Sequence, residues 1–158
     1  MRHFAKSDAL LNDPFASFSK IATFVILIKN LATMKTLGNI LWVILGGFVT
    51  ALVYYLIGFL YCITIIGIPF GVQIIKIGTF CLWPFGREMA DKPGQPGCLS
   101  TGFNVLWILT GWWEIAAFHL VLALLFTITI IGFPFGQMHF KIALGSIFPF
   151  GKEIRSIK

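Results

Sequence analysis

The sequence has few charged residues. Asp, Glu, Lys and Arg make up 11% of its 158 residues, whereas an average soluble domain carries about 25%. Residues 36–75 contain none of them, and neither do residues 115–140. A helix needs about 20 apolar residues to cross a bilayer, and a small soluble domain cannot hide so much apolar side chain from water. Both runs therefore predict membrane segments and argue against a soluble fold.

Cysteine is also scarce, and the common catalytic motifs are missing. The three cysteines, Cys62, Cys81 and Cys98, form no CxxC pair, which argues against a disulfide framework or a zinc site. The sequence contains no GxSxG, HExxH, Walker or Rossmann motif. We therefore expect no enzyme activity, no bound metal and no cofactor.

The net charge of +6 comes from basic residues that cluster where the apolar runs end. These are Lys29, Lys35, Arg87, Lys92, Lys152, Arg155 and Lys158. Lys and Arg beside short loops are typical of cytoplasmic flanks under the positive-inside rule, and they suit contact with anionic lipid headgroups. Because no separate basic domain is present, the expected partners include membrane lipids and exclude nucleic acid.

The chain contains an internal repeat. Residues 39–88 align without a gap on residues 104–153, and the identities include distinctive residue types. Among them are Asn39 and Asn104, Trp42 and Trp107, Gly46 and Gly111, Lys76 and Lys141, and Glu88 and Glu153. Composition bias aligns Leu with Leu, but it does not place such residues in register. The sequence therefore consists of two tandem copies of one module.

Each copy divides into three pieces. The first, residues 38–66 or 102–131, is apolar throughout. A Gly-x-Pro-x-Gly motif follows, at which we expect the helix to end or kink. Next comes a short helix, predicted at 72–83 or 137–148, which reaches about 18 Å and is too short to cross about 30 Å of hydrocarbon. We expect it to be an amphipathic helix at the interface, closed by a Pro-Phe-Gly motif. The structural residues of these motifs are Gly67, Pro69, Gly71, Pro84, Gly86, Gly132, Pro134, Gly136, Pro149 and Gly151.

The first piece of each copy allows two topologies. As a hairpin, it crosses the membrane twice, so that both Pro-Phe-Gly motifs, the linker and both termini face the cytoplasm. As one tilted helix of about 43 Å, it inverts the second copy and places the linker outside. All three flanks carry Lys or Arg, so the positive-inside rule favours the hairpin.

At the paired Pro-Phe-Gly and Gly-x-Pro-x-Gly motifs, the chain resembles the YccF family of bacterial inner-membrane proteins, whose domain is called the inner membrane component domain. The resemblance covers residues 35–154. It is carried by Asn39-Ile40-Leu41-Trp42-Val43-Ile44-Leu45-Gly46-Gly47, Gly111-Trp112-Trp113, Ile130-Ile131-Gly132-Phe133-Pro134-Phe135-Gly136, Lys141 and Pro149-Phe150-Gly151. The resemblance implies a location in the cytoplasmic membrane and no settled activity. Members of the family begin near the first Asn, whereas this chain starts earlier.

Ionisable residues within apolar sequence are functional candidates, because burying a charge in lipid is unfavourable. Lys76 and Lys141 either line a polar path or snorkel to fix helix depth, and we favour the anchoring role. Glu114 and His119 occur only in the second copy, where a proton relay is one interpretation. Five residues apart is about 500° around a helix, however, so they share no face. His139 is expected at the interface.

The sequence thus predicts an all-α, multi-pass protein of the bacterial inner membrane. Its parts are an N-terminal extension (1–34), expected to be dispensable, a first repeat (35–90), a linker (91–101) and a second repeat with a basic C-terminus (102–158). We expect a non-catalytic membrane component that forms a homo-oligomer and has room for a membrane-protein partner. The alternative is a subunit of a homo-oligomeric channel or carrier, because internal repeats and broken helices are common in transporters.

Overall fold

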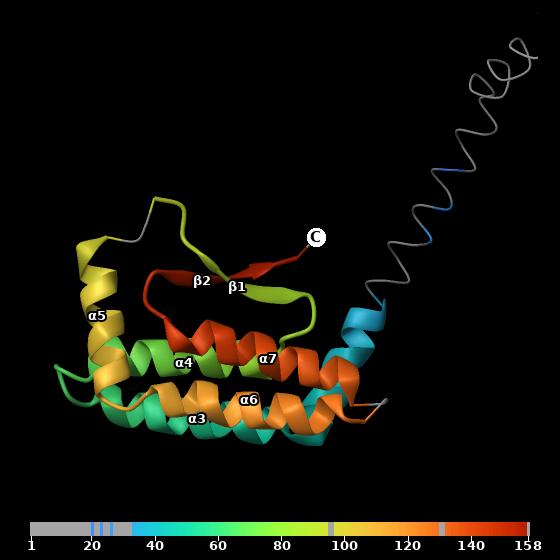
Figure 1. Ribbon diagram of the computed structural model, residues 1–158, viewed down its shortest axis with the longest axis horizontal. Helices are drawn as coiled ribbons and strands as arrows, with labels where there is room; N and C mark the ends of the chain where they lie inside the picture. The colour runs from blue at the N-terminus through green and yellow to red at the C-terminus, as the bar shows by residue number, and fades with distance from the viewer. Residues whose placement is uncertain are drawn as a thin grey trace, which may run out of the picture. The chain divides into compact units, whose positions relative to one another are not determined.

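The computed structural model describes residues 33–94, 97–129 and 132–157, together with Lys20, Thr23 and Ile26. The N-terminal extension predicted at 1–34 therefore lies almost entirely outside the described residues. Both repeats belong to one compact unit, Gly38–Lys158, which Figure 1 shows as a group of helices with a β-ribbon on one side.

The first repeat is a long helix followed by a shorter helix that folds back along it. The long helix, Thr33–Cys62, contains a π-helical turn, η1 (Val43–Gly47), and ends as α3 (Phe48–Cys62). α4 (Ile68–Leu82) runs antiparallel to α3, with Gly71 against Gly58 and Gly78 against Tyr54. The hairpin favoured within residues 38–66 is therefore wrong for this copy, because the chain bends at Gly46 and then continues as α3 to Cys62. The hairpin forms one helix later, between α3 and α4.

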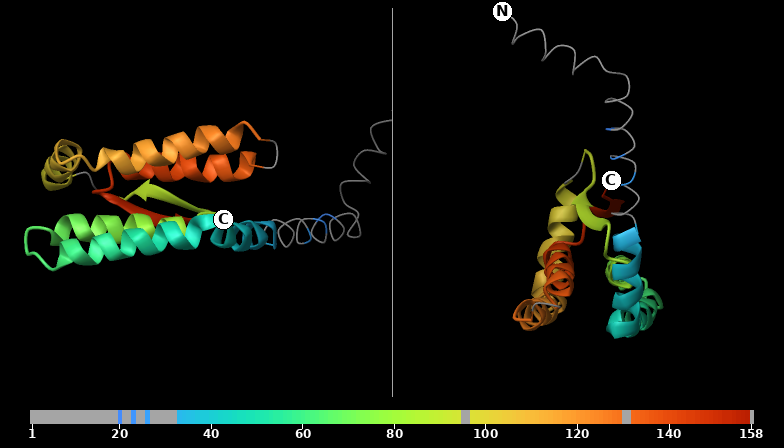
Figure 2. Two further views of the ribbon diagram at one scale, coloured as in Figure 1. Left: turned by 90° about the horizontal axis from the view of Figure 1, so that it is seen from below. Right: turned by 90° about the vertical axis from the view of Figure 1, so that its right-hand side faces the viewer.

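The second repeat forms the same hairpin, and its first helix is interrupted at the equivalent glycine, Gly111. α5 (Cys98–Leu109) and α6 (Trp113–Thr127) meet at a bend of 71°, and α7 (Phe133–Ile147) packs along α6. Figure 2 shows the two hairpins side by side, with the ribbon lying between them when they are seen from below.

A glycine at the same position interrupts the first helix of each copy. Gly46 and its equivalent Gly111 both have positive φ, +132° and +90°, so each copy is kinked at this point. The next residue is Gly47 in the first copy and Trp112 in the second. A Cβ at Gly47 would lie 2.2 Å from the Trp42 ring, so the first copy tolerates only glycine there. In the second copy, Trp112 stacks on the equivalent Trp107 at a centroid distance of 5.4 Å.

α4 and α7 begin earlier than predicted, at Ile68 and Phe133 rather than at 72 and 137. Pro69 and Pro134 lie in the first turn of these helices, where the missing backbone N–H leaves no hydrogen bond unmade. The Gly-x-Pro-x-Gly motif therefore starts a helix and does not interrupt one.

Two short strands connect the repeats. β1 (Arg87–Asp91) and β2 (Lys152–Ser156) pair antiparallel, with Met89 opposite Ile154. The all-α prediction is therefore wrong at these two segments, although the described part of the chain is mostly helical. Each strand is short and polar, and its hydrogen-bonding partner belongs to the other repeat, so neither segment indicates a strand by itself. The predicted linker, 91–101, contains the end of β1 and the start of α5.

The unit Gly38–Lys158 has three layers, which we call levels: the ribbon, α4 with α7, and α3 with α6. In Figure 1, the ribbon lies on one side of α4 and α7, while α3 and α6 lie on the other, and the end-on view of Figure 2 shows the same order. α5 runs across these levels. The core between the helices contains Trp42, Tyr54, Ile74, Ile77, Phe80, Trp107 and Ile142.

By length and composition, one helix of the described residues, Thr33–Cys62, is long and apolar enough to cross a membrane. The bent pair of α5 and α6 is a second candidate if it forms one span. Neither is straight, because Gly46 interrupts the first with non-helical backbone angles and the second bends by 71°.

Candidate functional site

Each Pro-Phe-Gly motif forms a tight turn that an asparagine of the same repeat holds in place. In the first repeat, Gly86 has φ +83°, and the Arg87 N–H donates to the Pro84 carbonyl at 3.1 Å. A type II turn needs positive φ at this position, which glycine adopts without strain. The Asn39 amide donates to the Phe85 carbonyl and accepts from the Phe85 N–H, both at 2.9 Å.

The second repeat reproduces this arrangement. Asn104 makes the same two hydrogen bonds with the backbone of Phe150, both at 3.0 Å, and Gly151 has φ +86°. The Pro-Phe-Gly motifs therefore have a structural role in both copies: they end the second helix of the hairpin and turn the chain into the ribbon.

In each repeat, a tryptophan donates a hydrogen bond to the last turn of the hairpin's second helix, α4 or α7. The Trp42 indole donates to the Cys81 carbonyl at 2.6 Å, and the Trp107 indole donates to the Ser146 carbonyl at 3.0 Å. Both rings are buried. The repeated spacing of Asn and Trp, three residues apart and so on one face of a helix, is the sequence signal of this contact.

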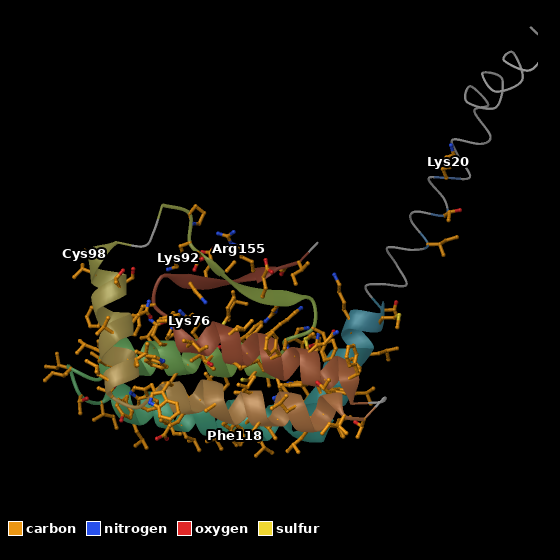
Figure 3. All side chains as sticks on the ribbon, viewed as in Figure 1. Lys20, Lys76, Lys92, Cys98, Phe118 and Arg155 are labelled. Atoms are coloured by element: carbon orange, nitrogen blue, oxygen red, sulfur yellow. The ribbon has the colours of Figure 1, made fainter. Side chains whose placement is uncertain are left out.

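Lys76 links the two repeats and does not simply extend to water. Its ammonium donates to the Pro149 carbonyl at 2.5 Å, to the Lys152 carbonyl at 3.0 Å and to the Gln73 side chain. Three acceptors match the three N–H groups of an ammonium. Burial, together with Lys92 and Lys152 nearby, lowers the pKa of Lys76 to about 8, so the group stays protonated at neutral pH. Figure 3 shows Lys76 on the ribbon side of the helices.

Lys141 is the equivalent residue, but its surroundings differ. It is half-buried and borders a hollow of about 180 Å³ together with Glu88, Met89, Gly145 and Lys152. The two lysines predicted as a matched pair thus lie on the same side of the unit, yet only Lys76 has hydrogen bonds to the turn of the other repeat among the described residues.

The two hairpins meet at a buried cluster of four polar side chains, one from each of α3, α4, α6 and α7. The Tyr54 hydroxyl lies 3.0 Å from His119 Nε2, and His119 Nδ1 lies 2.9 Å from His139 Nδ1. The thiol of Cys81 lies 3.7 Å from His119 Nε2. All four residues are buried. These side chains form a hydrogen-bonded chain through the interface between the repeats.

Two arrangements of the protons are consistent with these hydrogen bonds between Tyr54, His119 and His139. Either the Tyr54 hydroxyl donates to His119 Nε2 and His119 Nδ1–H donates to His139, or both bonds run the other way. Both imidazoles are neutral in either case, so the cluster places no unpaired charge between the repeats. Its chemistry is that of a buried hydrogen-bond network, which fixes how the two hairpins pack against each other.

The internal repeat explains why these residues meet. Tyr54 and His119 are equivalent positions of the two copies, as are Met89 and Ile154, which oppose each other in the ribbon. An approximate two-fold axis therefore passes through both pairs. The alignment of the copies shows that Tyr54 and His119 are equivalent residues. To predict from the sequence that they are neighbours, one must also assume that the two copies pack face to face.

The structure gives His119 other partners than the Glu114 considered from the sequence. His119 is fully buried and bonds to Tyr54 and His139. Glu114 is exposed in the first turn of α6 and borders a hollow of about 480 Å³ between α3 and α6.

The prediction that His139 is interfacial is wrong, because it is buried within the unit. Among the described residues, no group of three or more His, Cys, Asp or Glu is placed to hold a metal ion.

Comparison with known proteins agrees with the two-repeat organisation. The family model of the inner membrane component domain, YccF, matches twice, at residues 37–87 and 102–152. The chain is 31% identical over 134 residues to the inner membrane protein YccF of Escherichia coli (strain K12), covering 79% of this chain and 90% of that protein. The protein of the same name from Shigella flexneri matches to the same extent. No solved structure was found to match. The resemblance inferred from the repeated motifs is thus confirmed, and the chain belongs to the YccF family of inner membrane component domains.

Proposed function

We propose that the protein is a non-catalytic component of the bacterial inner membrane, with α3 and α6 in contact with hydrocarbon and the β-ribbon in contact with water and headgroups. The relatives are named inner membrane proteins. The observation that carries the proposal is the separation, within the unit Gly38–Lys158, of exposed apolar side chains from charged ones.

The apolar side consists of α3 and α6. Large apolar side chains are exposed along both helices: Phe48, Val49, Leu52, Val53, Leu56, Phe59 and Leu60 in α3, and Phe118, Leu120, Val121, Leu124 and Leu125 in α6. α3 contains no charged residue, and α6 contains only Glu114, in its first turn. Soluble monomers rarely expose a continuous apolar patch above a few hundred Å². Lipid hydrocarbon is the environment that this surface fits.

The charged side consists of the ribbon and its flanks. The charged residues of the two strands are Arg87, Glu88, Asp91, Lys152, Glu153 and Arg155. Figure 3 shows Arg155 and Lys92 on the opposite side of the helices from Phe118. A two-stranded ribbon also has two open edges, whose backbone groups need water or headgroups because hydrocarbon offers no hydrogen bonds.

The experiment is extraction of the full chain from bacterial membranes. We expect it to stay with the membrane in high salt and in alkaline carbonate, and to be released by detergent. As a matched pair, Leu56→Lys adds a charge to the apolar side and Ser156→Lys adds one to the ribbon. Leu56→Lys should lower the membrane-bound fraction, because a charge in hydrocarbon is unfavourable, and Ser156→Lys should not. Quantitative release of the unmodified chain by carbonate would contradict the proposal.

Lipids are the partners that this arrangement supports most directly, because the basic side chains of the ribbon and the apolar side chains of α3 and α6 lie on opposite sides of the unit, as headgroups and hydrocarbon do in a leaflet. The homo-oligomer and a membrane-protein partner stay predictions from the sequence. So does the alternative of a homo-oligomeric channel or carrier. A pore lined by α3 and α6 would have apolar walls without a ring of charge, whereas such rings are what select ions in many channels, and this favours the non-catalytic component.

A further inference from the structure

We infer that the unit Gly38–Lys158 inserts into the cytoplasmic leaflet alone, with its hairpins lying along the membrane plane. This inference rests on the proposed membrane location and specifies the surface that the protein recognises: the hydrocarbon of one leaflet together with its headgroups. It departs from the multi-pass topology expected from the sequence, because no part of the unit then reaches the far side.

The lengths of the helices are the first argument. α3 and α6 have 15 residues each, or about 22 Å at 1.5 Å per residue, whereas the hydrocarbon core is about 30 Å thick. The longer helix Thr33–Cys62 is kinked at Gly46, which leaves segments of similar length on either side. No straight helix within the described residues is therefore long enough to cross upright.

The hairpin tips are the second argument. A loop that emerges on the far side of a membrane meets water and headgroups, and polar residues suit it. The tip between α3 and α4 instead exposes Ile63, Ile65 and Ile66, with 78%, 87% and 86% of their surface accessible. Ile128, at the other tip, is 81% accessible. Thr64, the polar residue of the first tip, directs its hydroxyl to the Tyr61 carbonyl and the Gly67 N–H. Such tips fit hydrocarbon.

The direction of the ribbon is the third argument. Figure 1 and the left view of Figure 2 show the ribbon running alongside the helices, with the two hairpin tips at opposite ends of the unit. If the helices stood upright, the ribbon would lie at the depth of the bilayer centre, with its open edges and charges in hydrocarbon, which is strongly unfavourable. With the helices in the plane, the ribbon, Lys76 and Lys141 all face the headgroups.

The thickness of the unit agrees with one leaflet. Two levels of helices, at about 10 Å each, give about 20 Å, and half of a bilayer with its headgroups is about 20 to 22 Å. α5, which runs across these levels, has 12 residues and is about 18 Å long. The basic residues at Arg87, Lys92 and Lys152 assign the surface to the cytoplasm, following the positive-inside rule.

The test is sided cysteine labelling of the full chain in its native membrane. Cys62 and Cys81 are replaced by Ser, and Cys98, which is exposed, is kept as the reporter of the polar side. Two further variants carry Cys98→Ser with either Ile65→Cys or Ile128→Cys at a hairpin tip. A membrane-impermeant maleimide is applied to intact spheroplasts, to inside-out vesicles and to detergent-solubilised protein.

We expect Cys98 to react only in inside-out vesicles and in detergent, and both tip cysteines to react only in detergent. Labelling of a tip in intact spheroplasts would show that a hairpin crosses, and would overturn the inference. Labelling of Cys98 in intact spheroplasts would overturn the choice of leaflet. Failure of the proposed membrane location is distinguishable, because carbonate would then release the chain and tip cysteines would react without detergent.

A depth measurement provides an independent readout. The tip variants, labelled with a nitroxide in detergent and returned to lipid vesicles, should be more accessible to oxygen than to a water-soluble nickel chelate, as expected near the bilayer centre. Accessibility to the nickel chelate at either tip, while the protein remains vesicle-bound, would place that tip at an aqueous surface and contradict the inference.

Discussion

Lys76 and Lys141 hold equivalent positions in the two copies, yet their contacts show that equivalent sequence does not ensure an equivalent role. Lys76 donates to carbonyls of the other repeat at Pro149 and Lys152, whereas Lys141 borders a hollow beside Met89. The anchoring role favoured from the sequence for both lysines stays a prediction. For Lys76, the structure adds a bond between the repeats.

Replacing Lys76 should therefore weaken the fold more than replacing Lys141. We expect Lys76→Gln to lower the free energy of unfolding in mild detergent by about 1 to 2 kcal/mol, because it leaves carbonyls of the Pro149 turn without a donor. Lys141→Gln is the matched control and should change stability less. Equal effects of the two substitutions, measured by thermal unfolding, would show that the contact with the Pro149 turn contributes nothing measurable.

The buried cluster allows a second matched comparison, between neighbouring tyrosines. Tyr54→Phe removes the hydroxyl that pairs with His119, and should cost about 1 to 3 kcal/mol, because a buried partner is left unsatisfied. Tyr55→Phe removes a hydroxyl that donates to Thr79, 3.2 Å away, but Thr79 keeps its bond to the Ile75 carbonyl. It should therefore cost less. The reverse order of the two unfolding free energies would argue against a structural role for the Tyr54–His119 bond.

At the scale of elements, a glycine at the same position interrupts the first helix of each copy. Gly46 and Gly111 both have positive φ, and the segments before them carry Asn39 and Asn104 to the two Pro-Phe-Gly turns. The next residue differs, because Gly47 packs against the Trp42 ring whereas Trp112 stacks on Trp107. The two copies therefore share the interruption and pack differently beside it.

Gly47→Ala tests the close packing of Gly47 against the Trp42 ring. The added Cβ would lie 2.2 Å from the Trp42 ring, and overpacking of this kind costs about 1 to 3 kcal/mol. We expect a lower midpoint of thermal unfolding in detergent. Gly102→Ala is the control, because a Cβ at Gly102 meets no atom within 4 Å, and alanine favours helix over glycine. A Gly47→Ala variant as stable as the Gly102→Ala variant would show that the Trp42 ring imposes no requirement for glycine at this position.

At the scale of the whole molecule, the two repeats combine into one amphipathic unit, with charge at the ribbon and apolar side chains on α3 and α6. Neither repeat makes this surface alone, because each contributes one strand of the ribbon. The predicted homo-oligomer and the predicted dispensability of residues 1–34 also concern this scale, and they are examined by the same experiment.

Deletion of residues 1–33 should leave membrane retention and oligomeric state unchanged, because the compact unit begins at Gly38. The measurement is the particle mass in native lipid discs, made on the full chain and on the deletion variant. A strictly monomeric particle would refute the homo-oligomer and, with it, the channel alternative. Loss of membrane retention on deletion would show that the N-terminal segment is needed for insertion.

Several features of this protein followed from the sequence alone. The uncharged runs identified apolar helices, and the internal alignment identified two copies, because a repeated module requires the same distinctive residues twice. The Pro-Phe-Gly and Gly-x-Pro-x-Gly motifs carried the resemblance to the family, which the comparisons confirmed. The Pro-Phe-Gly motif could be interpreted as a chain break, since proline and glycine restrict or free the backbone locally. These inferences succeed because the determining interactions lie within a few residues of each other along the chain.

The tertiary structure alone revealed how the copies combine. β1 and β2 are too short to indicate strands, and each acquires its hydrogen bonds only from the other repeat. The Tyr54–His119–His139 chain and the bond from Lys76 to the Pro149 turn likewise join side chains far apart in the sequence. Long-range contacts depend on how whole hairpins pack, and a sequence pattern reports only the face that each helix buries. The two copies supplied the parts, and the approximate two-fold packing between them created the ribbon, the buried cluster and the separation of charged from apolar surface.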